Sequence, residues 1–488
     1  MPFTGGAYGL ARVTLGLFPG FLIGCCEAME YITYVASATI LLSEMLSAVS
    51  DTPDYMIPVY SLVIYFLACG ILITGGSIFW QISSIIGIIS LLILLIFCFG
   101  SIPYINFLQN ATSSSTTGSS NLEQEYFIDG IYGFMKILPL AAWFFVGIES
   151  LNLTASVVVT PKTTIPKGSI ACVLTLFICA ILVLFITASL PMNNETKIPI
   201  AYMTAPFSLG FSLMFNMNEN VAIAFSIPAT FATAYGFIFA YSRVLISMAR
   251  SLLFPSFLLK TYGKYHTPYV AILIGSVLGY CLCISVYFMP IINTYLFSIC
   301  ILSAFLAYIS QLIGYVIFKI KYDQRERKFT SPLGIFGAIY GCIIFIVAAI
   351  AICFFQDDDY INMICISILG SIYTFFYFSY SKKRQNFSSD EKIFFPVHVI
   401  KCKCFSLSPF SNISHLYEND FVFVFFYALF TSLTFFLSNF IYFIIFFQYL
   451  LLYFYSNFYL VLHRLMIFRD SHSKINFTFS YLFQFLSS

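Results

Sequence analysis

Charged residues are scarce in this sequence. Lys, Arg, Asp and Glu together make up 9% of the 488 residues, and the formal net charge is only +2. A soluble globular domain typically carries about 25% charged residues, so the composition excludes an ordinary soluble protein. It also argues against nucleic-acid binding, which requires a strongly basic surface.

The residue patterns of common soluble enzymes are missing as well. The sequence contains neither the Gly-Lys-Ser/Thr loop that binds nucleotide phosphates nor the His-Glu-x-x-His pair that binds zinc. All five histidines fall outside the membrane spans predicted below. We therefore expect no enzyme activity, no ATP-driven transport, and no metal or other cofactor.

Apolar residues, in contrast, make up 60% of the chain. They occur in blocks of about twenty residues, the length at which an α-helix crosses the hydrocarbon core of a bilayer. The sequence therefore predicts an all-α, multi-pass protein embedded in the lipid bilayer. Ten spans are expected, at about 15–42, 56–76, 81–103, 130–156, 168–190, 218–242, 268–289, 292–318, 333–355 and 360–379.

Basic residues concentrate in alternate connectors between these spans. Cytoplasmic loops are enriched in Lys and Arg, so these connectors are predicted to share the cytoplasmic side. The sequons at Asn110 and Asn194 then lie outside and are candidate glycosylation sites. A third sequon, at Asn152, falls at membrane depth and should be unused. The basic residues are Arg12, Lys162, Lys167, Arg243, Arg250, Lys260, Lys264, Lys319, Lys321, Arg325, Arg327, Lys328, Lys382, Lys383 and Arg384.

The stretch 386–488 differs in composition from the transmembrane domain predicted at 1–385. No glycine follows Gly370, Ala428 is the only alanine after Ala351, and Phe and Tyr dominate. Packed membrane helices need small residues for close approach. This tail is therefore predicted either as a lipid-facing hairpin at about 421–462, or as sequence that did not evolve as part of a transporter.

Three carboxylates lie inside predicted spans, with Glu27 and Glu30 in the first and Glu149 in the fourth. A charge inside a span costs about 2.5–3.5 kcal/mol on insertion scales, so each is a functional candidate. Glu27 and Glu30 are three residues apart and share one helical face. A carboxylate in a dehydrated cavity can bind an ammonium group or a proton. The alternative for each is a structural contact to a neighbouring helix or a water.

The fourth span also carries helix-breaking residues. Glycine and proline in a membrane helix often mean only a bend. Here they stand beside a carboxylate and several aromatic residues, and unwound backbone is tolerated at this depth only where it is buried in protein or lines a cavity. The pattern therefore favours a discontinuous helix at a site. The residues concerned are Pro139, Trp143, Phe144, Phe145, Gly147, Glu149 and Ser150.

Several motifs resemble the amino acid/polyamine/organocation (APC) transporter superfamily. Residues 5–12, Gly-Gly-Ala-Tyr-Gly-Leu-Ala-Arg, resemble its first cytoplasmic loop, and residues 143–150 resemble its sixth helix. Residues 160–168, 242–250 and 329–335 resemble later parts in the same order. Within the superfamily, the glutamate-rich first span and the Trp-Phe-Phe run are most similar to ethanolamine permeases.

The resemblance implies a LeuT-like fold of two inverted repeats, with substrate bound between broken helices. The ten spans would be family helices 3 to 12, so we expect an N-terminally truncated chain that lacks the first two helices. The resemblance also implies residue roles. Glu30 and Tyr31 would meet the substrate, while Trp143, with Phe144 beside it, would cap it. Gly147 would mark the unwound segment, Phe237 would close the opposite side, and Glu149, together with Glu27, would serve gating or protonation.

The resulting prediction is a secondary transporter of ethanolamine-like amines or of neutral or cationic amino acids, with either H⁺ or Na⁺ as the coupling ion. It is expected in the plasma membrane and works by alternating access. The alternative is a transport-inactive fragment that acts as a membrane partner or has no function, because the expected pattern lacks two family helices. The oligomeric state is not predicted.

Overall fold

The structure is a computed structural model, and it describes residues 5–105, 130–191, 205–321, 329–356, 361–388 and 391. The chain separates into two compact units, Met1–Ile413 and Ser414–Ser488, and every described residue belongs to the first. The predicted hairpin at 421–462 and the sequons at Asn110 and Asn194 lie outside the described residues.

The regular structure of the described residues is helical, as predicted, apart from one isolated bridge between Tyr262 and Thr267. In this part of the chain, ten stretches are long and apolar enough to cross a membrane, which agrees with the ten predicted spans. The longer helices are α1 (Gly6–Thr14), α2 (Leu17–Ser50), α3 (Ile57–Thr74), α4 (Gly76–Gly100), α6 (Gly130–Ala142), α7 (Pro161–Ser189), α8 (Phe207–Phe215), α10 (Ile227–Arg250), α11 (Tyr269–Phe288), α12 (Ile291–Lys321), α13 (Gly334–Phe354) and α14 (Ile361–Phe376). The short elements are η1 (Asp54–Met56), η2 (Ile102–Tyr104), η3 (Trp143–Phe145), η4 (Ile148–Ser156), α9 (Glu219–Ala222), η6 (Ile223–Ser226), η7 (Ser256–Leu259), η8 (Tyr377–Ser381) and α15 (Lys382–Arg384).

Three helices extend beyond their predicted ends. α2 continues from the predicted end at 42 to Ser50, where Asp51 adopts a left-handed conformation. α10 continues past 242 to Arg250, and α7 begins at Pro161 instead of 168. Hydropathy locates the apolar middle of a span, whereas the helix continues as far as its backbone hydrogen bonds do. Polar flanks and a proline in the first turn are compatible with helix.

The fourth span is interrupted, as its glycine and proline predict. After α6 and η3 the chain is extended at Val146, and Gly147 has φ 86°, before η4 begins. A positive φ is strained for residues with a Cβ and is readily adopted by glycine. Gly147 therefore sets the point at which the helix breaks.

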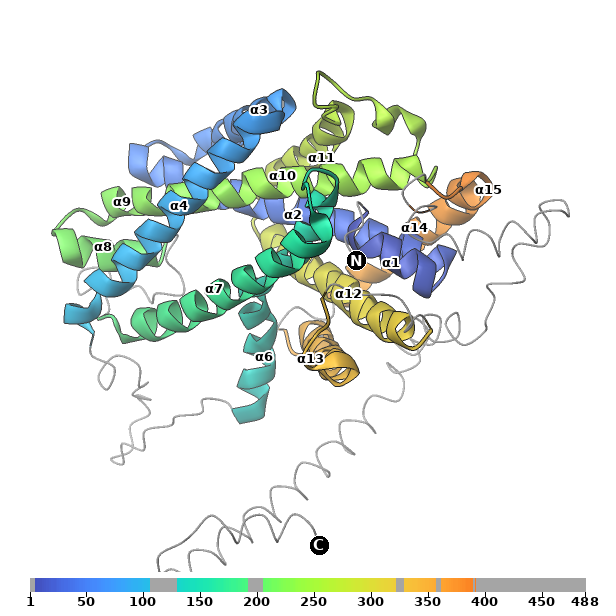
Figure 1. Cartoon of the computed structure of the whole chain (residues 1–488). Coiled ribbons are helices and arrows are strands. Elements are labelled where there is room, and N and C mark those ends of the chain that lie inside the picture. The colour runs from blue at the N-terminus through green and yellow to red at the C-terminus, as the bar shows by residue number, and fades with distance from the viewer. Residues whose placement is uncertain are drawn as a thin grey trace, which may run out of the picture. The chain divides into compact units, whose positions relative to one another are not determined.

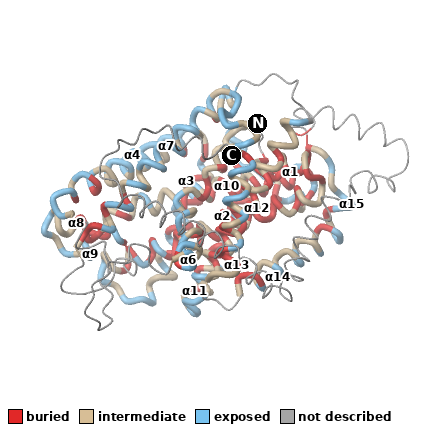
Figure 2. The backbone as a smooth tube through the Cα atoms, turned by 90° about the horizontal axis from the view of Figure 1, so that it is seen from below, coloured by how far each residue is buried: buried red, intermediate tan, exposed pale blue. Residues whose placement is uncertain are grey.

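Helix α2 lies at the centre of the described helices. It packs along α10 and α12 and also contacts α1, α3 and α11 (Figure 1). Residues of α2 and α12 are mostly buried, and α10 is buried mainly in its C-terminal half, whereas few residues of α4 and α7 are buried (Figure 2). Because most of the exposed residues of α4 and α7 are apolar, we assign these faces to lipid.

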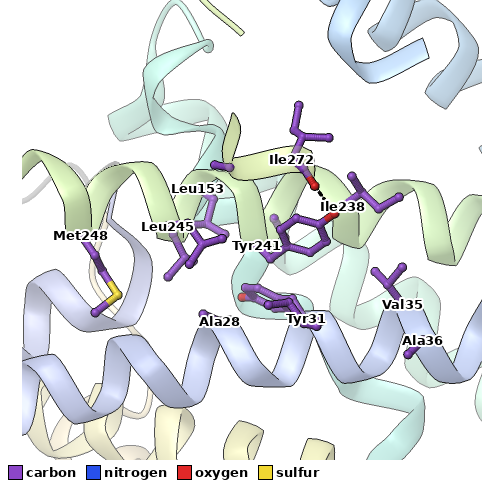
Figure 3. Packing of buried hydrophobic residues seen from close by; sticks show 14 of the residues in the cluster. Ala28, Tyr31, Val35, Ala36, Leu153, Ile238, Tyr241, Leu245, Met248 and Ile272 are labelled. Atoms are coloured by element: carbon purple, nitrogen blue, oxygen red, sulfur yellow. Dashed lines mark hydrogen bonds between the residues drawn. The ribbon is translucent and has the colours of Figure 1, made fainter. Parts of the chain in front are cut away.

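The contact between α2 and α10 forms most of the apolar core. Ala28, Tyr31 and Val35 of α2 lie opposite Ile238 and Leu245 of α10 (Figure 3). The Tyr241 hydroxyl of α10 donates to the Ile272 carbonyl oxygen at 3.0 Å, which ties α11 to the same core. The candidate site is therefore built on a rigid helix pair.

The helix ends that adjoin the basic connectors meet around α1. The Tyr8 hydroxyl bonds to Ser251 after α10, and α1 also packs on η4 and on α12. The Ser381 hydroxyl donates to the Leu253 carbonyl oxygen at 2.7 Å. The basic connectors thus leave from one end of the bundle, in agreement with the predicted alternation. That this end is cytoplasmic stays a prediction.

Candidate functional site

The three carboxylates predicted inside spans come together in the structure. Glu27 and Glu30 are fully buried, and Glu149 is 6% exposed. The Tyr31 hydroxyl donates to Glu149 Oε1 at 2.7 Å and also reaches Glu27 Oε1 at 3.5 Å. One phenol of α2 therefore connects two carboxylates from different helices. We call Glu27, Glu30, Glu149 and Tyr31 the acidic cluster.

Glu30 is the member of this cluster without a donor. Among the described residues, neither of its carboxylate oxygens has a hydrogen-bond donor, and the same holds for Glu149 Oε2. The Glu30 and Glu149 carboxyl groups are close enough for their charges to interact. A buried, uncompensated charge is strongly unfavourable. A proton or a cationic ligand at this pair would offset such a charge.

Glu27, in contrast, already has partners. Its two carboxylate oxygens accept hydrogen bonds from the backbone N–H groups of Ala7 and Tyr8, at 3.2 and 3.3 Å. These N–H groups belong to the first turn of α1, which offers them no helical acceptor and where a negative charge is favourable. Gly6 allows the approach, because a Cβ there would overlap Glu27 Oε1. The structure thus shows a structural contact for Glu27, and a gating role stays a prediction.

An aromatic cluster adjoins the acidic cluster. The Tyr34 ring stacks on Trp143 and contacts Phe237, both with centroids 4.4 Å apart. Phe237 also stacks on Tyr31 at 5.5 Å, and Trp143 contacts Phe297 of α12 at 4.2 Å. Because Tyr31 belongs to both clusters, aromatic faces lie beside the carboxylates. Such faces attract cations.

Of the predicted site residues in the fourth span, Phe144 lies apart from the aromatic cluster, whereas Gly147 lies beside it. Phe144 is 49% exposed, and within the described part of the chain no ring contact joins it to the aromatic cluster. It points away because it follows Trp143 directly in a helical turn. Gly147 does lie at the site, directly against the Phe237 ring, which a Cβ on Gly147 would overlap.

Sequence reasoning missed Tyr308, which holds the break. The Gly147 N–H donates to the Tyr308 hydroxyl at 2.9 Å, and that hydroxyl lies 3.5 Å from the Phe145 carbonyl oxygen. The Gly147 N–H and the Phe145 carbonyl oxygen have no helical partner at the break. The Tyr308 hydroxyl of α12 accepts from the first and donates to the second. Nothing in the eighth span marks this tyrosine. Tyr34, also missed, lies four residues after Glu30, so helical spacing placed it within reach of the candidate residues.

Ten membrane-length helical stretches among the described residues, one of them broken at a buried acidic cluster, define a multi-pass membrane protein with a polar site inside its bundle. The amino acid permease family model matches residues 1–390. The chain belongs to this family, as the resemblance to the APC superfamily predicted.

Individual relatives are distant. Histidine permease HisP of Lactococcus lactis subsp. cremoris is 24% identical over 41% of this chain and 43% of its own length. S-adenosylmethionine permease GAP4 of Candida albicans is 26% identical over 46% and 38%. Amino-acid permease RocC of Bacillus subtilis is 24% identical over 80% and 84%. The chain thus spans less than half the length of the first two. All three are named as permeases and none as an enzyme, in agreement with the prediction.

Proposed function

We propose that this chain is a secondary transporter of amino acids or related small amines that works by alternating access in the plasma membrane. The observation that carries the proposal is Glu30, a fully buried carboxylate with no donor in the described part of the chain, beside Glu149. A substrate ammonium group supplies up to three N–H donors and a positive charge. It would satisfy both the hydrogen-bonding and the charge requirement of the pair.

The aromatic cluster supports the same substrate class. A cation over an aromatic face gains about 0.5–2 kcal/mol, more where water is excluded. HisP is named for histidine and GAP4 for S-adenosylmethionine, and both compounds carry an ammonium group. Ethanolamine carries one too, so the ethanolamine-like prediction is part of this proposal.

The acidic pair also suggests how transport is coupled. A buried carboxyl group such as Glu30 can take up a proton when no substrate is present, and an ammonium group would replace that proton. Occupancy by H⁺ and by substrate would then be mutually exclusive at this position. We therefore favour H⁺ over Na⁺ as the coupling ion.

Uptake of labelled histidine, S-adenosylmethionine and ethanolamine by cells expressing the full chain tests the function. We expect Glu30→Gln to weaken uptake of the transported amine roughly tenfold to hundredfold, since a hydrogen bond to a charged group contributes about 1.5–3 kcal/mol. Glu44→Gln is the matched control, because Glu44 lies on the same helix but is exposed. Equal uptake by the two variants, at equal surface abundance, would refute the role of Glu30.

A further inference from the structure

A second buried polar cluster lies at the end of the bundle where α1 and the last span meet. Arg12 Nη1 of α1 contacts Glu391 Oε1 at 2.8 Å and Oε2 at 3.0 Å, and the side chains are 1% and 0% exposed. The two residues are 379 positions apart in sequence. A buried ion pair offsets its desolvation only with good geometry and further hydrogen bonds.

Those further bonds come from the residues that follow the last span, Gln385–Ser388 and Glu391, here called the post-span segment. Arg12 Nη2 donates to the Asn386 carbonyl oxygen at 3.1 Å, and the guanidinium lies 4.9 Å from the centre of the Phe387 ring. The Ser388 N–H donates to Glu391 Oε2 at 2.6 Å. Arg12 is thus enclosed by this segment.

The segment is also fixed to the end of α10. The Ser251 hydroxyl donates to Glu391 Oε2 at 2.9 Å, and the Asn386 N–H donates to the Ser251 carbonyl oxygen at 3.0 Å. The Tyr8 hydroxyl of α1 lies 3.2 Å from Ser251 Oγ. Burial raises the pKa of Tyr8, with the Glu391 charge as a further cause. Tyr8 therefore stays neutral, and its hydroxyl also donates to the Ser247 carbonyl oxygen of α10 at 3.0 Å.

Helix α1 connects this cluster to the acidic cluster. Its first turn donates N–H groups to Glu27, and Glu27 is within reach of the Tyr31 hydroxyl that holds Glu149. Its side chains Tyr8 and Arg12 hold Ser251 and Glu391. A short helix with polar contacts at both ends transmits its position from one cluster to the other.

We propose that Arg12 and Glu391 are a positioning pair, which locks α1 against the post-span segment and thereby fixes Glu27 and Tyr31 for the candidate site. The pair separates when α1 moves away from the segment. The effect on transport rests on the proposed function, whereas the locking of α1 does not.

The locking is tested by thiol labelling. Val13→Cys places a reporter on α1 at a position that is 5% exposed. A membrane-impermeant maleimide is applied to the end that carries the basic connectors, and labelling is counted above that of the chain with only its native cysteines. We expect Glu391→Gln or Arg12→Gln to accelerate labelling severalfold, because each leaves one buried charge unpaired.

The double variant Arg12→Gln/Glu391→Gln should label more slowly than either single variant, because both charges are gone and two amides can pair. Ser251→Ala removes one donor and should give an intermediate rate, which keeps the test valid if a charge variant misfolds. Lys383→Gln is the control, since Lys383 is an exposed cation in the same region. Labelling of Glu391→Gln at the rate of this control would overturn the proposal.

Uptake separates positioning from a merely structural role. Normalised to folded surface protein, Glu391→Gln should raise the KM severalfold and lower the rate per molecule, because Tyr31 would no longer be fixed where it holds Glu149 beside Glu30. The double variant should recover part of the rate. If Glu391→Gln only reduced the amount of folded protein and left the transport rate per molecule unchanged, the claim that the pair affects transport would be refuted. Absence of uptake by the unmodified chain would refute the proposed function instead, and labelling would still decide on the lock.

Discussion

The Tyr31 hydroxyl of α2 donates to the Glu149 carboxylate of η4, with 2.7 Å between the two oxygens. This bond joins the longest described helix to the broken span, and the donor ring also stacks on Phe237. A hydrogen bond to a carboxylate is roughly twice as strong as one between neutral groups. It holds Glu149 beside Glu30, and thereby creates the pair that we assign to the ammonium group or the proton.

Tyr31→Phe removes this bond and retains the ring. Since a hydrogen bond to a charged group contributes about 1.5–3 kcal/mol, uptake should fall roughly tenfold or more. Tyr34→Phe is the control, because no hydrogen bond of its hydroxyl is found among the described residues and its stacking on Trp143 is retained. Uptake assays of both variants at equal surface abundance make the comparison. If both variants transport equally well, the Tyr31 hydroxyl does not position Glu149 for transport.

Gly147→Ala should disable the site without removing any functional group. A residue with a Cβ at φ 86° is strained by about 1–2 kcal/mol, and the Cβ would also overlap the Phe237 ring. The break and the aromatic cluster cannot both keep their present geometry, so we expect uptake to be largely lost. Gly236→Ala, next to Phe237 but with open space around it, should transport normally. Normal uptake by Gly147→Ala would contradict the observed packing.

The ten spans could be predicted because the bilayer permits so few structures. An apolar stretch of this length with few internal charges satisfies its backbone hydrogen bonds within the bilayer as a helix. The same argument placed the interruption in the fourth span, where Gly147 offers a left-handed conformation. It could not place the ends of α2 and α10. Backbone hydrogen bonding, which the apolar pattern does not record, sets those ends.

The site could be predicted only where an intramembrane charge or a helix break marks it. Glu30, Glu149 and Gly147 carry such a signal. Tyr308 and Phe297 are aromatic residues in an apolar span, where such residues are common. Only the packing of α12 against the break shows that Tyr308 bonds to Gly147 and that Phe297 contacts Trp143. The pairing of Arg12 with Glu391 was equally invisible, because two residues 379 positions apart carry no mutual signal in a single sequence.

Tyr308→Phe should weaken the broken span. It leaves the buried Gly147 N–H without its acceptor, and an unpaired buried donor costs about 1–3 kcal/mol. We expect a lower thermal midpoint for the purified protein in detergent, together with reduced uptake. Tyr315→Phe is matched to it, since Tyr315 lies on the same helix with no hydroxyl hydrogen bond among the described residues. A thermal midpoint equal to that of the control would show that water or a rearranged backbone replaces the Tyr308 hydroxyl.

The orientation in the membrane gives a prediction that is independent of transport. The basic connectors leave from the end of the bundle that holds α1, so the connectors with Asn110 and Asn194 should face the exterior. In a glycosylating host, Asn110→Gln and Asn194→Gln should each remove one glycan, seen as a mobility shift that an endoglycosidase abolishes. Asn152→Gln should remove none, because Asn152 lies in η4, which packs on α1 at the basic end. No shift for either Asn110→Gln or Asn194→Gln would mean that the chain is inserted in the opposite sense. The locked end around Arg12 and Glu391 would then face outward, and the maleimide experiment would have to be run from the other side.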